Sequence, residues 1–301
     1  MKFSFFGTPD IAAQTLDTLE GLGFVPTVIV TAPDRPVGRK QILTAPSVKI
    51  WGQERNIPVI QPEGKLDDAF LTELSSHNCE LNVVVAYGKI IPTRVITATK
   101  FGTINVHYSL LPKWRGASPI EAAILNGDSE TGITIQQMVF ALDEGPVLMQ
   151  KIYPLNGSEF AYKLKEIFAP MGGEMLAELL PKIESREVEP LEQDDSQATY
   201  KNKFDKSEGE VDLDEMSDDE LWRRWRAYYG WPGMYYFETT PSKSQSSDLS
   251  PSLRSGSGGT ISTLAESSKP KRVIVKDAEF ENGKFIIKKI LHEGESKVIE
   301  I

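Results

Sequence analysis

The stretch LNVVVAY, residues 81–87, is a continuous apolar run. Runs of this kind are typical of a strand that helices cover on both faces, as in the centre of a parallel sheet. The stretch therefore predicts a buried central strand, and the segments on either side of it indicate what kind of sheet surrounds that strand.

Strand-like and helix-like segments alternate on both sides of this run. The expected strands are 2–6, 27–31, 58–61, 102–107, 131–139 and 147–154, and the expected helices are 9–20, 47–55, 67–75, 91–99 and 118–125. Such alternation predicts an α/β fold, with a mostly parallel sheet and helices on both faces. Ligands of these sheets bind beyond the carboxyl ends of the strands, so we expect functional residues there.

The second half of the chain has a different pattern. A long helical pattern over 158–183 leads into an acidic, irregular segment, and SDDE at 217–220 has the form of a capping box that begins a helix ending at Gly230. Short strand candidates follow, separated by a stretch rich in Ser, Gly and Pro. We predict a large α/β domain over 1–186, an acidic linker over 187–206, and a small β-rich, barrel-like domain over 207–301 with a disordered insert at 241–270.

Composition narrows the class of protein. The 301 residues carry a formal net charge of −10 and a single cysteine, Cys79, so no internal disulfide forms and no Cys/His cluster indicates a metal site. No apolar run approaches the length of a membrane span. We therefore expect a cytoplasmic protein without a metal, acting as a monomer. Because the acidic residues concentrate between 192 and 220, the overall charge does not argue against binding nucleic acid.

Three polar residues are candidates for chemistry. Asn105 and His107 lie two apart on an expected strand, so their side chains project from the same face. Asp143 follows after one more helix and strand, where a neighbouring strand can return it to His107. A carboxylate beside an imidazole fixes its tautomer, and an amide can donate to an oxyanion. The set suits attack on a carbonyl without a covalent intermediate, although polar residues at the ends of strands also serve only to satisfy turns.

Longer stretches carry a resemblance. INVHYSLLPKWRGASPI (104–120) and GITIQQMVFALDEGPVL (132–148) closely resemble the 10-formyltetrahydrofolate-dependent formyltransferases, as do MKFSFFGTPDIAAQTLDTL (1–19) and VVVAYGKIIP (83–92). The resemblance covers residues 1–185. Two further stretches, TAPDRPVGRKQILTAPSVK (31–49) and LWRRWRAYYGWPGMYY (221–236), are similar to the members that act on methionyl-tRNA.

The resemblance implies an activity and a site. The family transfers the formyl group of 10-formyltetrahydrofolate, and its catalytic asparagine, histidine and aspartate fall on Asn105, His107 and Asp143. Its folate-binding positions fall on Tyr87, Gly88, Ser109, Leu110, Leu111 and Pro112. The implied reaction is formylation of the amino group of methionyl-initiator tRNA, for translation initiation.

The resemblance also implies a contact with tRNA. The loop that enters the acceptor arm corresponds to residues 34–43, where Arg35, Arg39 and Lys40 supply charges that pair with phosphates. Without the resemblance, the alternative interpretation of the same residues is a solvated basic loop over the edge of the sheet.

One departure and several alternatives accompany this interpretation. Tyr108 stands where the family has a small residue or proline, so we expect a tighter or more occluded turn after His107. A sugar-nucleotide N-formyltransferase shares the catalytic half and the folate donor, but it would lack the basic loop and the Arg/Trp-rich helix. The remaining alternatives are a catalytically silent RNA-binding relative and a hydrolase that releases formate from the same folate.

Overall fold

The computed structural model describes residues 1–38, 40–238 and 271–301. It divides into two compact units: Met1–Asp205 with Arg226–Tyr229, and Lys206–Trp225 with the described part of Gly230–Ile301. The segment expected as a linker thus belongs, up to Asp205, to the first unit. Arg39 and the expected insert at 241–270 lie outside the described residues.

The first unit is built on one seven-stranded sheet. Its strands, in spatial order, are β10 (Val147–Pro154), β9 (Glu130–Gln137), β7 (Thr103–His107), β6 (Leu81–Val85), β1 (Phe3–Gly7), β2 (Val28–Val30) and β5 (Val59–Ile60). The five strands from β7 to β5 are parallel, β9 pairs antiparallel with β7, and β10 pairs antiparallel with β9. The predicted mostly parallel sheet is confirmed.

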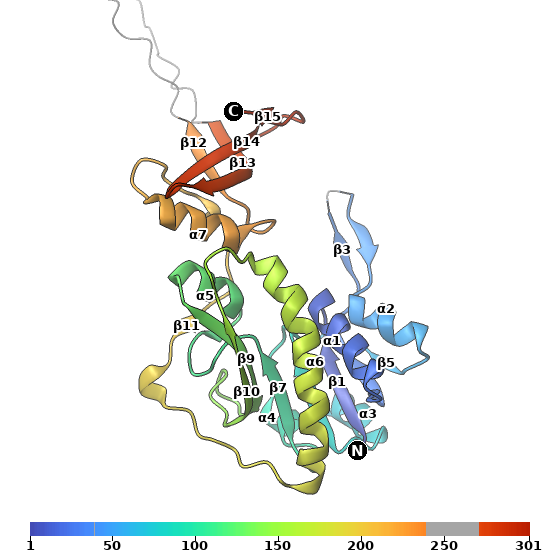
Figure 1. The fold of residues 1–301 in the computed structure, drawn as a ribbon. Helices are drawn as coiled ribbons and strands as arrows, with labels where there is room; N and C mark the ends of the chain where they lie inside the picture. Colours follow the sequence, from blue (N-terminus) through green and yellow to red (C-terminus); the bar gives the residue numbers. More distant parts are fainter. Residues whose placement is uncertain (39, 239–270) are drawn as a thin grey trace, which may run out of the picture. The chain divides into compact units, whose positions relative to one another are not determined.

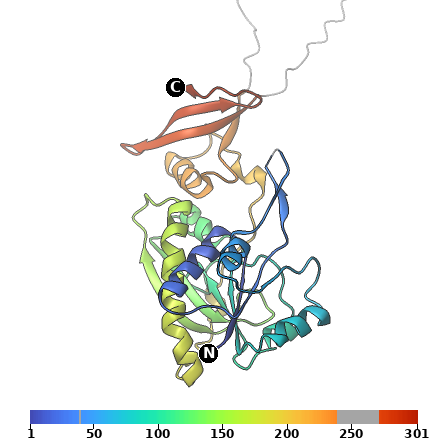
Figure 2. The ribbon, with the colours of Figure 1, turned by 90° about the vertical axis from the view of Figure 1, so that its right-hand side faces the viewer.

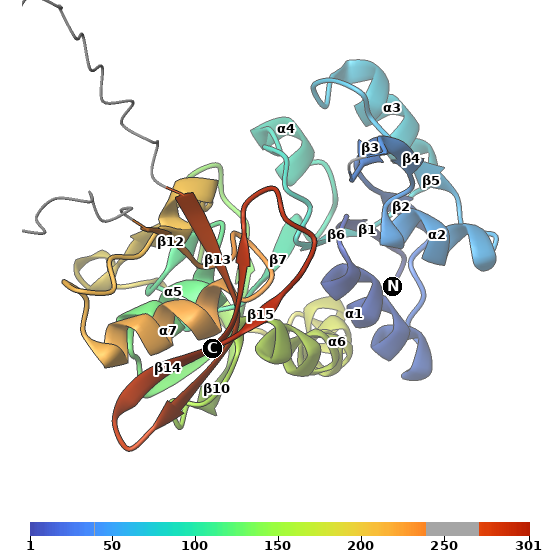
Figure 3. The same cartoon turned by 90° about the horizontal axis from the view of Figure 1, so that it is seen from above.

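Helices cover both faces of this sheet. They are α1 (Asp10–Gly21), α2 (Ser47–Glu54), α3 (Asp68–Ser76), α4 (Thr93–Ile96), α5 (Pro119–Asn126) and α6 (Ala161–Ser185). Seen from above, α1 and α6 lie on one side of the strands, and α3 and α4 on the other (Figure 3). Two separate clusters of buried side chains match this arrangement, because α1, α2, α5 and α6 share one cluster and α3 and α4 the other.

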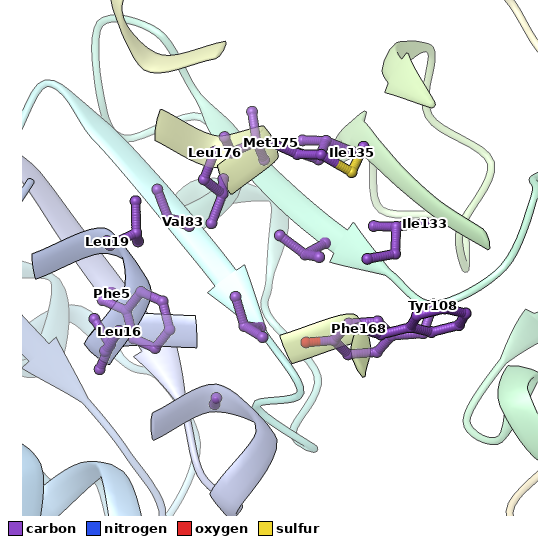
Figure 4. Packing of buried hydrophobic residues seen from close by; sticks show 14 of the residues in the cluster. Phe5, Leu16, Leu19, Val83, Tyr108, Ile133, Ile135, Phe168, Met175 and Leu176 are labelled. Atoms are coloured by element: carbon purple, nitrogen blue, oxygen red, sulfur yellow. The ribbon is translucent and has the colours of Figure 1, made fainter. Parts of the chain in front are cut away.

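Alternation along the strands divides the core between the two faces. Phe5, Val83 and Val85 belong to the cluster with α1 and α6, while the neighbouring Phe6 and Val84 belong to the cluster with α3 and α4. Figure 4 shows the first cluster, in which Phe5 lies beside Leu16 of α1 and Val83 beside Leu176 of α6. Because both faces of β6 are buried, its sequence is apolar without alternation, as LNVVVAY predicted.

Tyr108, the residue that departs from the family pattern, does not close the turn after His107. Its ring stacks with Phe168 of α6, with centroids 6.4 Å apart and planes at 15°, inside the cluster shared by α1 and α6 (Figure 4). The side chain therefore packs under the sheet, on the side away from His107. The expected occlusion is wrong because strand alternation carries this ring to the opposite face.

Two small pairings complete the first unit. Within the stretch 34–43, expected as a flexible loop, β3 (Arg35–Val37) pairs antiparallel with β4 (Ile42–Thr44), and this blue hairpin projects from the rest of the first unit (Figure 2). In addition, β8 (Arg115–Gly116) pairs in parallel with β11 (Tyr200–Lys201), which follows a short 3₁₀ turn, η1 (Asp195–Gln197).

The second unit contains an antiparallel sheet. Its strands in order are β12 (Tyr235–Glu238), β13 (Lys271–Glu281), β14 (Lys284–His292) and β15 (Ile299–Glu300), preceded by η2 (Lys206–Gly209) and α7 (Asp218–Tyr228). The side chain of Ser217 accepts a hydrogen bond from the Glu220 amide at 3.3 Å, as the capping box predicts. None of the helices in the described ranges is long and apolar enough to cross a membrane.

Close packing of α1 on α6 generates a stability prediction. A Cβ atom on Gly173 would lie 2.7 Å from the Thr18 Cβ and 2.9 Å from the Thr15 carbonyl oxygen, so Gly173→Ala forces the helices apart. We expect it to lower the free energy of unfolding by about 1–3 kcal/mol. Gly21→Ala, with open space around the new methyl group, is the matched control, and should be neutral or stabilise by up to ~1 kcal/mol. Equal urea midpoints for the two variants would contradict this account.

Candidate functional site

The candidate site begins on the last three residues of β7. Ile104 and Val106 point into the cluster under α6, so Asn105 and His107 occupy the other face. Asn105 is half-buried and lies in register between Val84 of β6 and Gln136 of β9. Within the described residues its side chain has no hydrogen-bond partner. Its amide is therefore available to donate to a ligand.

His107 is held between an acceptor and a carboxylate. Its Nε2 lies 2.9 Å from the Trp114 carbonyl oxygen, and its Nδ1 lies 3.7 Å from Oδ2 of Asp143. Because a carbonyl oxygen only accepts, Nε2 must carry a hydrogen and donate it. The other nitrogen, Nδ1, is on the side of the ring that faces the carboxylate.

Asp143 is oriented by two donors. Its Oδ1 accepts from Nε2 of Gln136 at 2.9 Å, and its Oδ2 accepts from the Gly116 amide at 2.8 Å. The backbone of Asp143 has φ 55°, in the left-handed region that aspartate tolerates better than most residues. The expected return of this carboxylate to His107 is thus observed, although it lies on the loop after β9 and not on the strand itself.

The two ends of the loop around Asp143 lie close together. The Gln137 amide donates to the Pro146 carbonyl at 2.9 Å, which brings the two ends of the loop together. Gly145 lies so close to the main chain of Gln137 that a Cβ atom on Gly145 would be 1.7 Å from the Gln137 carbonyl oxygen. Only glycine fits at this position, which explains why Gly145 follows Asp143 and Glu144.

The expected folate-binding residues lie beside His107. Ser109 and Leu111 are buried, whereas Leu110 and Pro112 are half-exposed. Thr134 of β9 fixes this loop, because its hydroxyl accepts from the Leu111 amide at 3.0 Å and donates to the Ser109 carbonyl at 2.7 Å.

Tyr87 and Gly88 follow the neighbouring strand β6. Tyr87 is buried edge-on against Phe6, with centroids 5.5 Å apart, while Gly88 is exposed with φ 77°. Burial raises the pKa of Tyr87 to about 12, so its phenol is neutral at physiological pH.

The hairpin expected to contact tRNA is exposed but anchored at its base. Arg35 and Lys40 are both exposed. The Asp34 carboxylate accepts from Gln61 Nε2 at 2.8 Å and from Lys49 Nζ at 2.8 Å, and these hydrogen bonds lower the pKa of Asp34. Three apolar side chains on the hairpin are also largely exposed: Val37 (56%), Ile42 (61%) and Leu43 (68%).

Three residues of the site escaped sequence reasoning. Gln136 donates a hydrogen bond to the carboxylate of Asp143. Arg115 is buried, with 1% of its surface exposed, and Gln193 donates to the main chain of the Asp143 loop. Among the described residues no group of three or more histidine, cysteine or acidic side chains could hold a metal ion.

Comparisons with known proteins show which family the sequence matches. The formyl transferase family model matches residues 1–180. A methionyl-tRNA formyltransferase from Caldicellulosiruptor saccharolyticus is 41% identical over 237 residues, covering 78% of this chain and 75% of that protein.

Two solved structures have a similar fold. An N-formyltransferase from Helicobacter canadensis, solved with folinic acid and dTDP-3-aminofucose, has a TM-score of 0.60 and 18% identity, covering 80% of this chain and 89% of its own. A methionyl-tRNA formyltransferase from Clostridium thermocellum has a TM-score of 0.57 and 14% identity, covering 100% and 99%. At such identities the structural matches establish the fold alone.

The hydrogen bond to Trp114 predicts the tautomer of His107. In the neutral ring the hydrogen should lie on Nε2, because the Trp114 carbonyl accepts there. Long-range ¹H–¹⁵N correlation spectra at high pH report the tautomer directly. The half-buried His77 at the end of α3 provides an internal comparison in the same spectra. A hydrogen on Nδ1 of His107 would contradict the arrangement described above.

Proposed function

The chain belongs to the methionyl-tRNA formyltransferase family, and from that premise we propose that it transfers the formyl group of 10-formyltetrahydrofolate to the amino group of methionyl-initiator tRNA. It is a formyl-transferring enzyme, and we propose that it acts in translation initiation, as a cytoplasmic monomer. The observation that carries the proposed reaction is the approach of His107 to Asp143, 3.7 Å apart, beside an Asn105 amide that is available to a ligand.

The proposed reaction is a direct attack on a carbonyl. The amine of the methionyl group attacks the formyl carbon, and the carbonyl oxygen becomes an oxyanion. Asn105 and the protonated His107 are the groups proposed to stabilise this oxyanion, each from a fixed position on β7. Preorganised donors of this kind need no reorientation as the charge develops.

Proton movement completes the transfer. The bond between the formyl carbon and N10 of tetrahydrofolate breaks, and the proton lost by the attacking amine must reach N10. Asp143 is the group proposed to hold the imidazolium and to assist this proton transfer, since Gln136 and Gly116 hold its carboxylate next to His107. A positioned acid–base group contributes ~10²–10⁴ in rate.

The folate would lie along two loops that meet at the ends of β6 and β7. Gly88 exposes its main chain, and the half-exposed Leu110 and Pro112 offer apolar contacts, while Tyr87, Ser109 and Leu111 support them from below. Hydrogen bonds from Thr134 and from Gln150, whose Nε2 donates to the Leu111 carbonyl at 3.0 Å, keep the second loop in place before any ligand binds. Preorganisation of this kind lowers the cost of ordering on binding.

The function is tested by formyl transfer from 10-formyltetrahydrofolate to methionine-charged initiator tRNA. Product should form with tRNA and not with an amino-sugar nucleotide offered as the acceptor. His107→Ala should lower kcat by about 10²–10⁴-fold, because it removes both the oxyanion donor and the partner of Asp143. His77→Ala is the control, and circular dichroism should show an intact fold for both. Product with the sugar nucleotide alone would refute the proposed acceptor, and near-normal turnover of His107→Ala would refute its role.

The hairpin generates a second prediction. Replacing both Arg35 and Lys40 with Glu should raise the KM for tRNA at least ~10-fold, because each reversal turns an attraction to phosphate into repulsion. The KM for the folate and the kcat at saturating tRNA should stay within about twofold. Lys2→Glu is the control, because this exposed lysine lies before the amino end of β1, whereas the hairpin follows the carboxyl end of β2.

Salt separates the proposed role of the hairpin from a general loss of activity. The KM for tRNA of the unaltered protein should rise steeply with salt, and that of the hairpin variant less steeply, since fewer phosphate contacts remain. An unchanged KM for tRNA at low salt would refute the assignment of the hairpin.

A further inference from the structure

Residues 191–201, here called the strap, lie against the loops that surround His107. The strap follows the end of α6 and returns along the outside of the sheet to β11 (Figure 1). At its start, the amides and carbonyls of Leu191 and Val147 pair at 2.8 and 2.9 Å. At its end, β11 pairs with β8, and a Cβ atom on Gly116 would lie 2.3 Å from the Lys201 carbonyl oxygen.

The strap contacts both groups that hold the ring of His107. The side chain of Thr199 accepts from the Trp114 amide at 2.9 Å, and the Trp114 carbonyl is the acceptor for His107. On the other side of the ring, Gln193 reaches the loop of Asp143. Its Nε2 donates to the Asp143 carbonyl at 2.8 Å and to the Gly145 carbonyl at 2.7 Å.

Gln193 is itself fixed at its other end. Its Oε1 accepts from Arg115, with the guanidinium Nη2 at 2.9 Å and Nε at 3.2 Å. Arg115 is buried, and it donates further to Asp195 at 2.6 Å and to the Tyr200 hydroxyl at 3.0 Å. An amide whose oxygen is held by a buried cation has little freedom to turn, so its NH₂ group stays directed at the two carbonyls.

The Asp143 loop needs this support because little apolar packing holds it. Two of its large apolar side chains are mostly exposed, Phe140 by 68% and Leu142 by 58%. The Asp143 backbone is also left-handed, a conformation that a non-glycine residue keeps only when its surroundings impose it. Polar contacts, rather than burial, must therefore determine where the Asp143 carboxylate lies.

We propose that Gln193 is a positioning residue for Asp143. By binding the main-chain carbonyls of Asp143 and Gly145, it keeps the left-handed turn in place and so holds the carboxylate next to His107. Gln193 does not need to touch either substrate. Its expected effect on turnover rests on the proposed formyl transfer, whereas its effect on the loop does not.

Gln193→Ala should lower kcat about 10–100-fold, since a displacement of about 1 Å in a catalytic group can reduce the rate 10²-fold. The KM for both substrates should stay within about threefold. Gln197→Ala is the matched control, because this exposed glutamine lies on the same strap and, among the described residues, its side chain hydrogen-bonds only to the Ser196 hydroxyl, at 3.4 Å. It should leave kcat unchanged. Normal turnover of Gln193→Ala would overturn the proposal.

A second substitution separates the two ends of Gln193. Gln193→Glu keeps an acceptor for Arg115 but directs a negative charge at the two carbonyls, so it should be at least as impaired as Gln193→Ala. Near-normal turnover of this variant would show that only the contact with Arg115 matters, and would overturn the proposal.

A double-mutant cycle tests whether Gln193 acts through Asp143. In an Asp143→Asn background, Gln193→Ala should reduce kcat by less than about threefold, because the group that it positions is already impaired. The same 10–100-fold reduction in both backgrounds would indicate a general structural role and would refute positioning.

Hydrogen exchange gives a test that needs no activity. Gln193→Ala should speed amide exchange in peptides covering 138–146 and leave peptides of β6 and β7 unchanged. If the unaltered protein fails to formylate methionyl-tRNA but this exchange pattern appears, the proposed function is refuted, whereas the positioning of the Asp143 loop by Gln193 is supported. Unchanged exchange over 138–146 would overturn the positioning itself.

Discussion

The hydrogen bond from His107 to the Trp114 carbonyl is the interaction on which the rest of the site depends. It commits Nε2 to a structural role and leaves Nδ1 to face Asp143 at 3.7 Å. That separation is longer than a hydrogen bond, and it places the carboxylate beside the ring. If the ring turned by 180° about the Cβ–Cγ bond, carbon atoms would take the places of both nitrogens, and both contacts would be lost. The neighbouring loops can thus be understood as the supports of one imidazole orientation.

Those supports come from both the sheet and the strap. His107 lies on β7, and Gln136 lies on the neighbouring strand β9. The pairing of these strands therefore fixes the position of Gln136, which donates a hydrogen bond to Asp143. Trp114 and Gly116 lie after β7, and both are only half-buried. The strap pairs with the segment after β7 and, through Gln193, with the loop of Asp143. Residues remote in sequence thereby hold both sides of the ring.

The sequence predicted what depends on local pattern. LNVVVAY indicated a strand buried on both faces, and the spacing of Asn105 and His107 placed them on one face. Residues 34–43 were expected as a loop, and the strands β3 and β4 leave no burial pattern in the sequence, since their apolar side chains are exposed. The strap was expected as a linker, because it is acidic and irregular, and its order comes from pairing with a distant loop. Gln193 and Arg115 could not be found from sequence, since their partners are defined only by the tertiary fold.

Polar anchoring of the loops also follows from what the proposed reaction requires. Two large substrates must reach the ends of the strands, so the loops there cannot be covered by other elements or held by a shared apolar core. Hydrogen bonds to buried groups can hold such loops from one side while the other side stays open. Thr134 under the loop of Leu111 and Arg115 behind Gln193 both follow this arrangement. The rigid sheet sets the position of His107, and these anchored loops determine what can reach it.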